Sequence, residues 1–210
     1  MDEQTIKEAL ISGQTEQLCD SVKDSLKGGE TPKAVLDVMI EGMQVVGDRF
    51  QKKEIFIPEV LLSARAMTAA TDILKPLLVE SGMEPLGKVV IGTVLGDLHD
   101  IGKNIVGMML EGNGFEVVNL GRDVAPERFV ESVKDTGAKV VGLSSLITTS
   151  MPQMKRTIEL LEADGLKDST FVMVGGAPVT QEFADSIGAD GYADDATGAV
   201  RKVKEMLGIG

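Results

Sequence analysis

Residues 88–104 read KVVIGTVLGDLHDIGKN, and this stretch is the clearest indication of the fold class. Its opening run, KVVIGT, is mostly apolar and β-branched without polar alternation, which is typical of a strand buried on both faces. A loop with glycine and aspartate follows, and a helix is expected from about Lys103. A buried strand followed by a helix is the repeating unit of a parallel α/β sheet.

The same unit recurs to the end of the chain. Further strands are expected at 115–119, 139–143, 171–174 and 191–192, with helices near 103–112, 126–136, 151–163, 180–187 and 195–207. We therefore predict a flavodoxin-like (Rossmann-type) doubly wound domain with a five-stranded parallel sheet over residues 88–210.

The N-terminal part has a helical period instead. Apolar residues recur at steps of three or four residues over 1–80, and Thr31-Pro32 is a capping hydroxyl followed by a proline suited to the first helical position. Short connections between these stretches predict a four-helix bundle. Residues 81–87 contain breaker residues and no period, which favours a linker.

Composition excludes several classes of function. Lys and Arg number 21 against 33 Asp and Glu, a net charge of -12, which disfavours a nucleic-acid partner. The lone Cys19 cannot form an internal disulfide. No apolar run approaches the ~18 residues of a membrane span, and the polar, acidic N-terminus is unlike a signal peptide. We expect a cytoplasmic protein with no membrane partner.

Ligands of open parallel sheets bind beyond the carboxyl ends of the strands. Three predicted loops lie there, over 96–104, 144–150 and 175–178. The first carries His99, the only histidine of the chain. One imidazole is too little for a zinc site, but it suffices where a macrocycle supplies the other metal ligands. Asp97 is placed to accept the second ring N–H; the alternative is a loop histidine that caps a helix.

The neighbouring motifs point to a family. Asp97, His99 and Gly102 form Asp-x-His-x-x-Gly, followed by the Ser-x-Leu of Ser144 and by the glycine pair that starts at Gly175. Together, in this order, they resemble the cobalamin-binding domain of methionine synthase and of corrinoid methyl-carrier proteins. Residues 42–67, GMQVVGDRFQKKEIFIPEVLLSARAM, resemble the helical cap module of the same family. The resemblance covers nearly the whole chain.

The resemblance implies a cofactor and its ligands. The cofactor would be cobalamin, as methylcobalamin or cob(I)alamin, or another corrinoid, with its nucleotide tail displaced so that His99 is the lower axial ligand of cobalt. Ser150 would extend the Asp97–His99 relay. The implied cofactor contacts are Asp97, His99, Asp100, Ile101, Gly102, Ser144, Leu146, Thr148, Ser150, Gly175 and Gly176, with Phe50, Ile57 and Val60 covering the upper face. For the two glycines a tight turn, and for the cap residues ordinary helix packing, are the alternatives.

The resemblance also implies a function in one-carbon metabolism. The protein would carry a methyl group on cobalt from a substrate:corrinoid methyltransferase to a methylcorrinoid:acceptor methyltransferase that uses tetrahydrofolate or a thiol. A reductive activation protein would be a further partner, and the chain would be a component of a methyltransferase system rather than a complete enzyme. Methanol, methylamine, betaine-type and aryl methyl ether systems all stay open, because specificity lies in the partner.

Two other classes share the central motif. One is the adenosylcobalamin-binding subunit of a B12-dependent mutase, which usually accompanies a large barrel and does not need a helical cap. The other is a cobalamin-sensing regulator, which adds a DNA-binding domain for which we expect no room here, since the helical part starts almost at residue 1. The methyl carrier is the preferred hypothesis.

Overall fold

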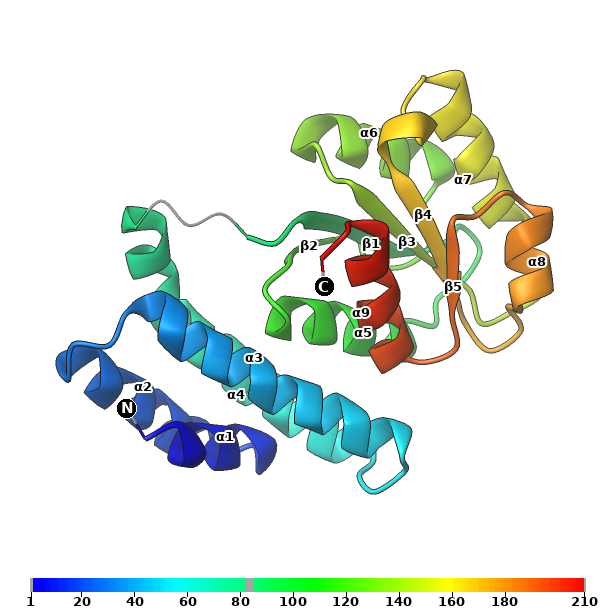
Figure 1. The fold of residues 1–210 in the computed structure, drawn as a ribbon. Helices are drawn as coiled ribbons and strands as arrows, with labels where there is room; N and C mark the ends of the chain where they lie inside the picture. Colours follow the sequence, from blue (N-terminus) through cyan, green and yellow to red (C-terminus); the bar gives the residue numbers. More distant parts are fainter. Residues whose placement is uncertain (1, 82–84, 210) are drawn as a thin grey trace. The chain divides into compact units, whose positions relative to one another are not determined.

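The computed structural model describes residues 2–81 and 85–209 (Figure 1). The chain divides into two compact units, a helical one formed mainly by residues up to Pro85 and an α/β one formed mainly by residues from Leu86 onward. The linker expected at 81–87 includes residues 82–84, which lie outside the described residues.

The helical unit contains the expected bundle. Its helices are α1 (Glu3–Ile11), α2 (Thr15–Lys27), α3 (Pro32–Gln51) and α4 (Ile57–Glu80). Thr31 caps α3 as expected: its hydroxyl accepts a hydrogen bond from Ala34 N at 3.2 Å, and Pro32 follows. The bundle core is aliphatic and rich in methionine, with Ile6, Leu10, Leu18, Val22, Met39, Met43, Met67 and Leu74 buried.

Helix α4 contains a proline near its C-terminal end. It starts at Ile57, where the Glu59 carboxylate accepts a hydrogen bond from Phe56 N at 3.1 Å and so satisfies an amide at the helix start. It continues past Pro76 to Glu80. A proline removes one hydrogen bond from a helix but does not always end it, so α4 continues. No helix within the described residues is long and apolar enough to cross a membrane.

The α/β unit has the expected parallel sheet. Its strands are β1 (Lys88–Thr93), β2 (Glu116–Asn119), β3 (Val140–Ser144), β4 (Phe171–Gly175) and β5 (Gly191–Ala193), in the order β2-β1-β3-β4-β5. The helices are α5 (Ile101–Gly112), α6 (Pro126–Thr136), α7 (Pro152–Ala163), α8 (Gln181–Ser186) and α9 (Ala196–Met206), with a short 3₁₀ turn at Lys167–Ser169. This confirms the predicted doubly wound domain.

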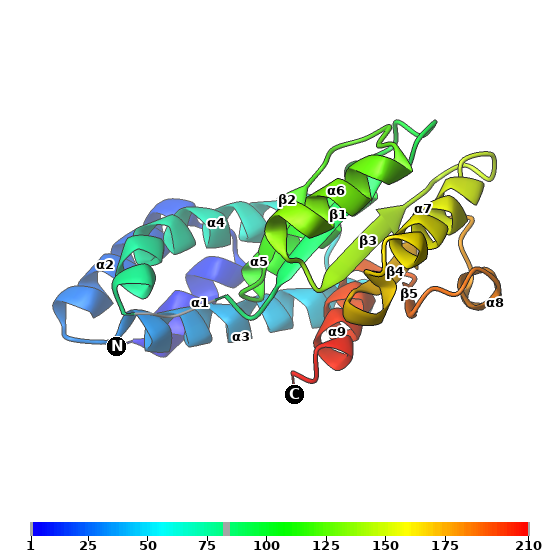
Figure 2. The same cartoon turned by 90° about the horizontal axis from the view of Figure 1, so that it is seen from above.

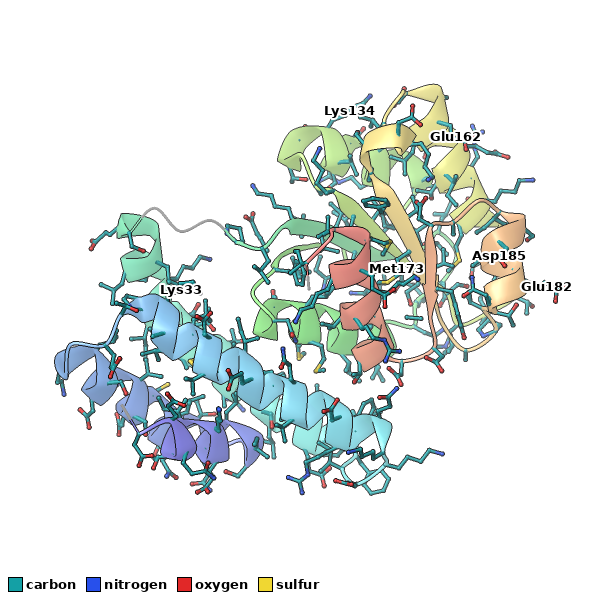
Figure 3. The ribbon with its side chains drawn as sticks, viewed as in Figure 1. Lys33, Lys134, Glu162, Met173, Glu182 and Asp185 are labelled. Carbon is teal, nitrogen blue, oxygen red and sulfur yellow. The ribbon has the colours of Figure 1, made fainter. Side chains whose placement is uncertain are left out.

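Helices cover both faces of the sheet. Helices α6, α7 and α8 lie on one face and α5 and α9 on the other (Figures 1 and 2). Phe129 of α6 is fully buried against β1 at Gly92, where a Cβ would come within 2.6 Å of the ring. Figure 3 shows Met173 on β4, which is buried, and charged side chains such as Lys134 and Glu162 on the surrounding helices.

The strand order creates one switch point. Strand β1 pairs with β2 on one side and with β3 on the other, so the chain leaves β1 and β3 in opposite directions. The loops that follow these two strands meet at this edge: Val94 N donates to Ser144 O at 3.0 Å. The predicted site residues of both loops therefore lie together.

Candidate functional site

The centre of the switch point is the side chain of Asp97. It follows a turn in which Gly96 has a left-handed backbone with φ 82°, and Asp97 itself is fully buried. One carboxylate oxygen, Oδ1, accepts hydrogen bonds from His99 N at 2.9 Å and lies 2.8 Å from His99 Nδ1. Asp97 thus binds both the backbone and the ring of His99.

The second oxygen, Oδ2, faces the loop after β3. It accepts hydrogen bonds from Leu146 N at 2.6 Å, Ile147 N at 3.2 Å and Ser150 Oγ at 3.2 Å. Burial of the carboxyl group opposes ionisation, but the hydrogen bonds from His99, Leu146 and Ile147 outweigh it and hold the pKa of Asp97 well below its ordinary range. Asp97 is therefore an anion that only accepts hydrogen bonds.

The imidazole of His99 is oriented by this anion. Because Asp97 accepts, Nδ1 donates, and the neutral ring keeps its lone pair on Nε2. The side chain is 56% exposed, and Nε2 makes no hydrogen bond to any residue in the described parts of the chain. Thr93 Oγ1 donates to His99 O at 3.1 Å and fixes the backbone. A nitrogen lone pair that could bind a metal is thus available on an exposed side chain at the sheet edge.

Two serine hydroxyls, rather than one, support Asp97. Ser150 was expected from the sequence; Ser145 was not. Their Oγ atoms lie 2.7 Å apart, both hydroxyls are within 2.9 Å of Ile147 O, and Ser145 Oγ also lies 3.4 Å from Asp97 Oδ2. The only sequence feature that could have pointed to Ser145 was its position directly after Ser144. Ser144 ends β3 and is half-buried, whereas Ser145 points into the polar cluster.

The motif glycines have different environments. At Gly176, with φ 131°, a Cβ would lie 1.8 Å from Ser145 O, so the protein itself demands glycine. At Gly175 a Cβ would lie 3.0 Å from Ala193 O. At Gly102, near the start of α5, a Cβ would meet nothing within 4 Å. The tight-turn interpretation therefore explains Gly176, while Gly102 borders open space.

Apolar side chains are exposed beside the imidazole. Leu98 is 60% exposed, Ile101 is 70% exposed and Leu146 is 45% exposed. Asp100 is half-buried and Thr148 is exposed in the same two loops. Exposed apolar groups that gather around a polar centre are typical of a ligand surface.

A buried lysine that the sequence analysis did not single out anchors the start of α5. Lys103 Nζ donates to Asn104 Oδ1 at 2.5 Å and to Asn119 Oδ1 at 2.6 Å, which ties the helix to the end of β2. Burial lowers the pKa of Lys103, and the negative charge of Asp100 opposes that effect. Within the described residues, no three His, Cys, Asp or Glu side chains gather as a metal site.

The helical unit holds the three expected cap residues in different settings. Phe50 is half-buried near the end of α3, Ile57 is 41% exposed at the start of α4, and Val60 is only 1% exposed. Phe56, which the sequence analysis did not name, is 64% exposed. The turn between α3 and α4 therefore presents apolar side chains, and Val60 packs inside the bundle.

Comparison with known proteins decides the family. Residues 87–201 and residues 2–75 each match a family described as a B12 binding domain. A dimethylamine corrinoid protein of Methanosarcina barkeri is 45% identical over 206 residues, 97% of this chain and 96% of that protein. This chain is a corrinoid protein of the B12-binding family. It binds cobalamin or a related corrinoid.

Solved structures agree with this assignment. The corrinoid protein superimposes with a TM-score of 0.83 on a cobalamin-binding protein from Desulfitobacterium hafniense, at 32% identity and 98% coverage of each chain. It matches a chain of the methanol:cobalamin methyltransferase complex from Methanosarcina barkeri with a TM-score of 0.87 at 30% identity, covering 98% of this chain and 79% of that one.

The strand edge of this corrinoid protein fits its cofactor. A single nitrogen ligand at the surface suits a metal whose other positions are filled by a macrocycle. Exposed Leu98, Ile101 and Leu146 offer an apolar face, and the open space at Gly102 leaves room beside the backbone. Both properties suit a large, flat ring with an appended tail.

Proposed function

We propose that this protein carries a methyl group on the cobalt of its corrinoid between two methyltransferases, with His99 as the lower axial ligand. One observation carries the proposal: the chain's only histidine has Nδ1 2.8 Å from a buried carboxylate, its side chain is 56% exposed, and Nε2 has no hydrogen-bond partner among the described residues. The bound corrinoid would supply a cobalt nucleophile that accepts a methyl group and releases it to a second acceptor.

The residues around His99 set its strength as a ligand. Asp97 fixes the Nδ1–H tautomer and so leaves the Nε2 lone pair for a metal, as carboxylates behind metal-bound histidines do. The amides of Leu146 and Ile147 and the two serine hydroxyls keep the carboxylate ionised and immobile. Coordination by His99 would favour the higher-valent metal of a bound corrinoid, and the polar cluster would support that coordination by holding the imidazole in place.

The remaining strand-edge residues would hold the rest of the cofactor. Asp100, Ile101 and Gly102 would border the ring and leave passage for the displaced nucleotide tail. Ser144, Leu146 and Thr148 would line the slot for the tail's base, with Gly175 and Gly176 as the opposite wall. The exposed apolar side chains support this assignment, because a ring face of mixed polarity needs apolar cover.

The helical unit would shield the upper face of the ring. Of the three expected residues, Ile57 is exposed and Phe50 is half-exposed, so both are accessible for such a contact. Val60 would act indirectly, since it is buried within the bundle. Apolar cover excludes water and oxygen from a reactive metal.

A methylated amine of the dimethylamine type is the proposed methyl donor, with a substrate-specific methyltransferase as first partner. The name of the relative at 45% identity supports this choice, and the match to a chain of a cobalamin methyltransferase complex supports direct association with such an enzyme. A second methyltransferase would pass the methyl group to tetrahydrofolate or a thiol, and a reductive activation protein would restore the working oxidation state.

The ligand role is tested with labelled histidine. Protein grown with ¹⁵N-histidine and loaded with cobalamin should show, in the cobalt(II) EPR spectrum, splitting from a nitrogen that follows the label. His99→Ala should lose this splitting entirely yet keep its fold, because the ring is mostly exposed. Asp135→Ala, at an exposed position on α6, serves as the control. Label-independent splitting in the unsubstituted protein contradicts the proposal.

The donor class is tested with purified partners. The loaded protein, mixed with methyltransferases for dimethylamine, monomethylamine or methanol, should be methylated fastest by the dimethylamine enzyme. Absorbance of the corrinoid follows the reaction directly. Equal rates with all three enzymes, or methylation only from methanol, would refute the amine assignment without affecting the role of His99.

A further inference from the structure

The turn before Asp97 is held by a residue from a fourth loop, the one between β2 and α6. Asp123 Oδ1 accepts a hydrogen bond from Gly96 N at 2.7 Å. The backbone N–H of Asp123 donates to Asp97 O at 3.0 Å, and the next residue, Val124, donates to Thr93 O at 3.0 Å. One residue therefore makes both a side-chain and a backbone bond to the turn that carries the buried carboxylate.

The backbone of Asp123 shows that the side chain matters there. Its φ is 57°, in the left-handed region where glycine is the least costly residue and where Asp and Asn are the best tolerated alternatives. A glycine would give the loop its shape at lower cost but would leave Gly96 N without its carboxylate acceptor. Compared with glycine, aspartate at this position therefore adds a carboxylate that accepts the hydrogen bond from Gly96 N.

Asp123 adds bonds from outside the turn to the one within it, in which Asp97 N donates to Val94 O at 3.1 Å. Leu95 and Gly96 are exposed, whereas Asp97 is buried immediately after them. The carboxylate of Asp97 is fixed by the loop after β3, and the carbonyl of His99 is fixed by Thr93. Asp123 bonds to Gly96 and to the carbonyl of Asp97, so it constrains the backbone that leads into the buried carboxylate.

We propose that Asp123 is a positioning residue for His99. It touches neither the ring nor the proposed metal position and acts through the Gly96–Asp97 backbone. The inference builds on the proposed ligand role of His99. Without the Asp123 acceptor, the turn loosens, the Asp97–His99 bond is populated less, and the imidazole adopts other orientations and tautomers.

Three substitutions of Asp123 and one control substitution elsewhere separate the contributions of this residue. Asp123→Gly removes the acceptor and keeps a backbone suited to positive φ. Asp123→Asn keeps both an acceptor oxygen and tolerance of that φ, so it should restore the original behaviour. Asp190→Ala is the matched control, because Asp190 Oδ2 accepts from a backbone amide, Val172 N, at 2.6 Å at the opposite end of the strands. Asp123→Ala repeats the removal of the acceptor in a loop that is less flexible than with glycine.

The first measurement uses the protein without cofactor. Since the chain has one histidine, a tag-free, ¹⁵N-labelled sample gives a single set of imidazole signals in a long-range ¹H–¹⁵N spectrum. We expect the unsubstituted protein and Asp123→Asn to carry the ring proton on Nδ1. In Asp123→Gly the ratio of the Nδ1–H to the Nε2–H form should fall about three- to tenfold, the loss of one hydrogen bond.

The second measurement uses the cobalamin-loaded protein and the ¹⁵N-histidine EPR signal. The ratio of histidine-bound to histidine-free cobalt(II) should fall by a similar factor in Asp123→Gly and recover in Asp123→Asn. Asp190→Ala should lower the melting temperature and change neither spectrum. If Asp123→Gly kept both unsubstituted spectra, or if Asp190→Ala changed them equally, the positioning role would be wrong.

The two proposals fail in different ways. If the unsubstituted, loaded protein shows no histidine nitrogen on cobalt, the ligand role of His99 fails. The tautomer ratio of the cofactor-free protein still decides whether Asp123 positions the ring, because that spectrum needs no metal.

Discussion

The strand-edge loops and the α3–α4 turn carry the proposed contacts to the two faces of the cofactor, and they are specified by different physics. Around Asp97 the loops are held by short, directional hydrogen bonds to a buried anion. Each side chain in this cluster therefore has a specific donor or acceptor role. In the α3–α4 turn the relevant side chains are aliphatic or aromatic, and the same residue types also form the bundle core. A polar site can therefore be predicted from the residue types in the sequence, whereas apolar residues that cover a ligand can be recognised only from their exposure in the structure.

The largest effect should come from the strand-edge loops. Gly176→Ala should destabilise the α/β unit by at least about 3 kcal/mol, since the new Cβ would meet Ser145 O at 1.8 Å and the backbone is left-handed. Tyr192, the only tyrosine in a chain without tryptophan, lies in β5, so its fluorescence reports unfolding of this unit.

Gly165→Ala is the control for backbone strain alone. Its φ is 68°, but a Cβ there meets nothing within 4 Å, so the cost should be only about 1 kcal/mol. Equal losses for the two variants would mean that the contact with Ser145 is not what makes glycine necessary.

The second effect tests the buried anion. Asp97→Asn should lower the free energy of unfolding by about 3 kcal/mol at neutral pH. The amide places an NH₂ group among other hydrogen-bond donors, and it removes a charge that accepts several hydrogen bonds. The native pKa of Asp97 is lowered, so its stabilisation is full above the unfolded pKa of about 4 and is lost as the pH falls below it.

Denaturant titrations followed by Tyr192 fluorescence measure this difference between pH 3 and 8. Asp135→Asn, which neutralises an exposed carboxylate on α6, should show a small, uniform change. A difference between Asp97→Asn and the unsubstituted protein that stayed constant down to pH 3 would contradict an ionised Asp97 with a lowered pKa.

These effects also show what the sequence could and could not predict. The parallel sheet follows from buried β-branched runs, and Asp97 and His99 from the Asp-x-His-x-x-Gly motif on the first loop of the sheet edge. Ser150 was expected only because the motifs resemble a family that has a serine in this relay. Ser145 and Asp123 were missed because a hydroxyl beside Ser144 and an aspartate in a loop are common residues. Only the folded chain shows that Ser145 faces Asp97 and that Asp123 bonds to Gly96. Likewise, no pattern distinguishes the buried Val60 from the exposed Ile57.

The third effect tests the apolar region. Val60→Ala should destabilise the helical unit by about 2 kcal/mol, because the side chain is fully packed, whereas Ile57→Ala should cost less than about 1 kcal/mol. Function should show the reverse order. Ile57→Ala should speed the oxidation of reduced, bound corrinoid by air, measured by absorbance, and Val60→Ala should have a smaller effect while it is folded, because its side chain would act only indirectly. If oxidation were faster in Val60→Ala alone, the prediction that Ile57 shields the ring directly would be wrong.

The smallest effect on stability concerns Gly102, which differs from Gly176 because no protein atom lies where its Cβ would be. Gly102→Ala adds a methyl group into open space near the start of α5, so the stability of the cofactor-free protein should stay within about 0.5 kcal/mol or rise slightly. If the displaced tail of the corrinoid passes there, the same methyl group should weaken hydroxocobalamin binding, measured by absorbance titration. Gly107→Ala on the same helix should give the opposite result, a lower melting temperature with binding retained, because its Cβ would lie 2.7 Å from Ile91 Cδ1. Unchanged binding in Gly102→Ala would place the tail elsewhere, since glycine at this position has no other neighbour to accommodate.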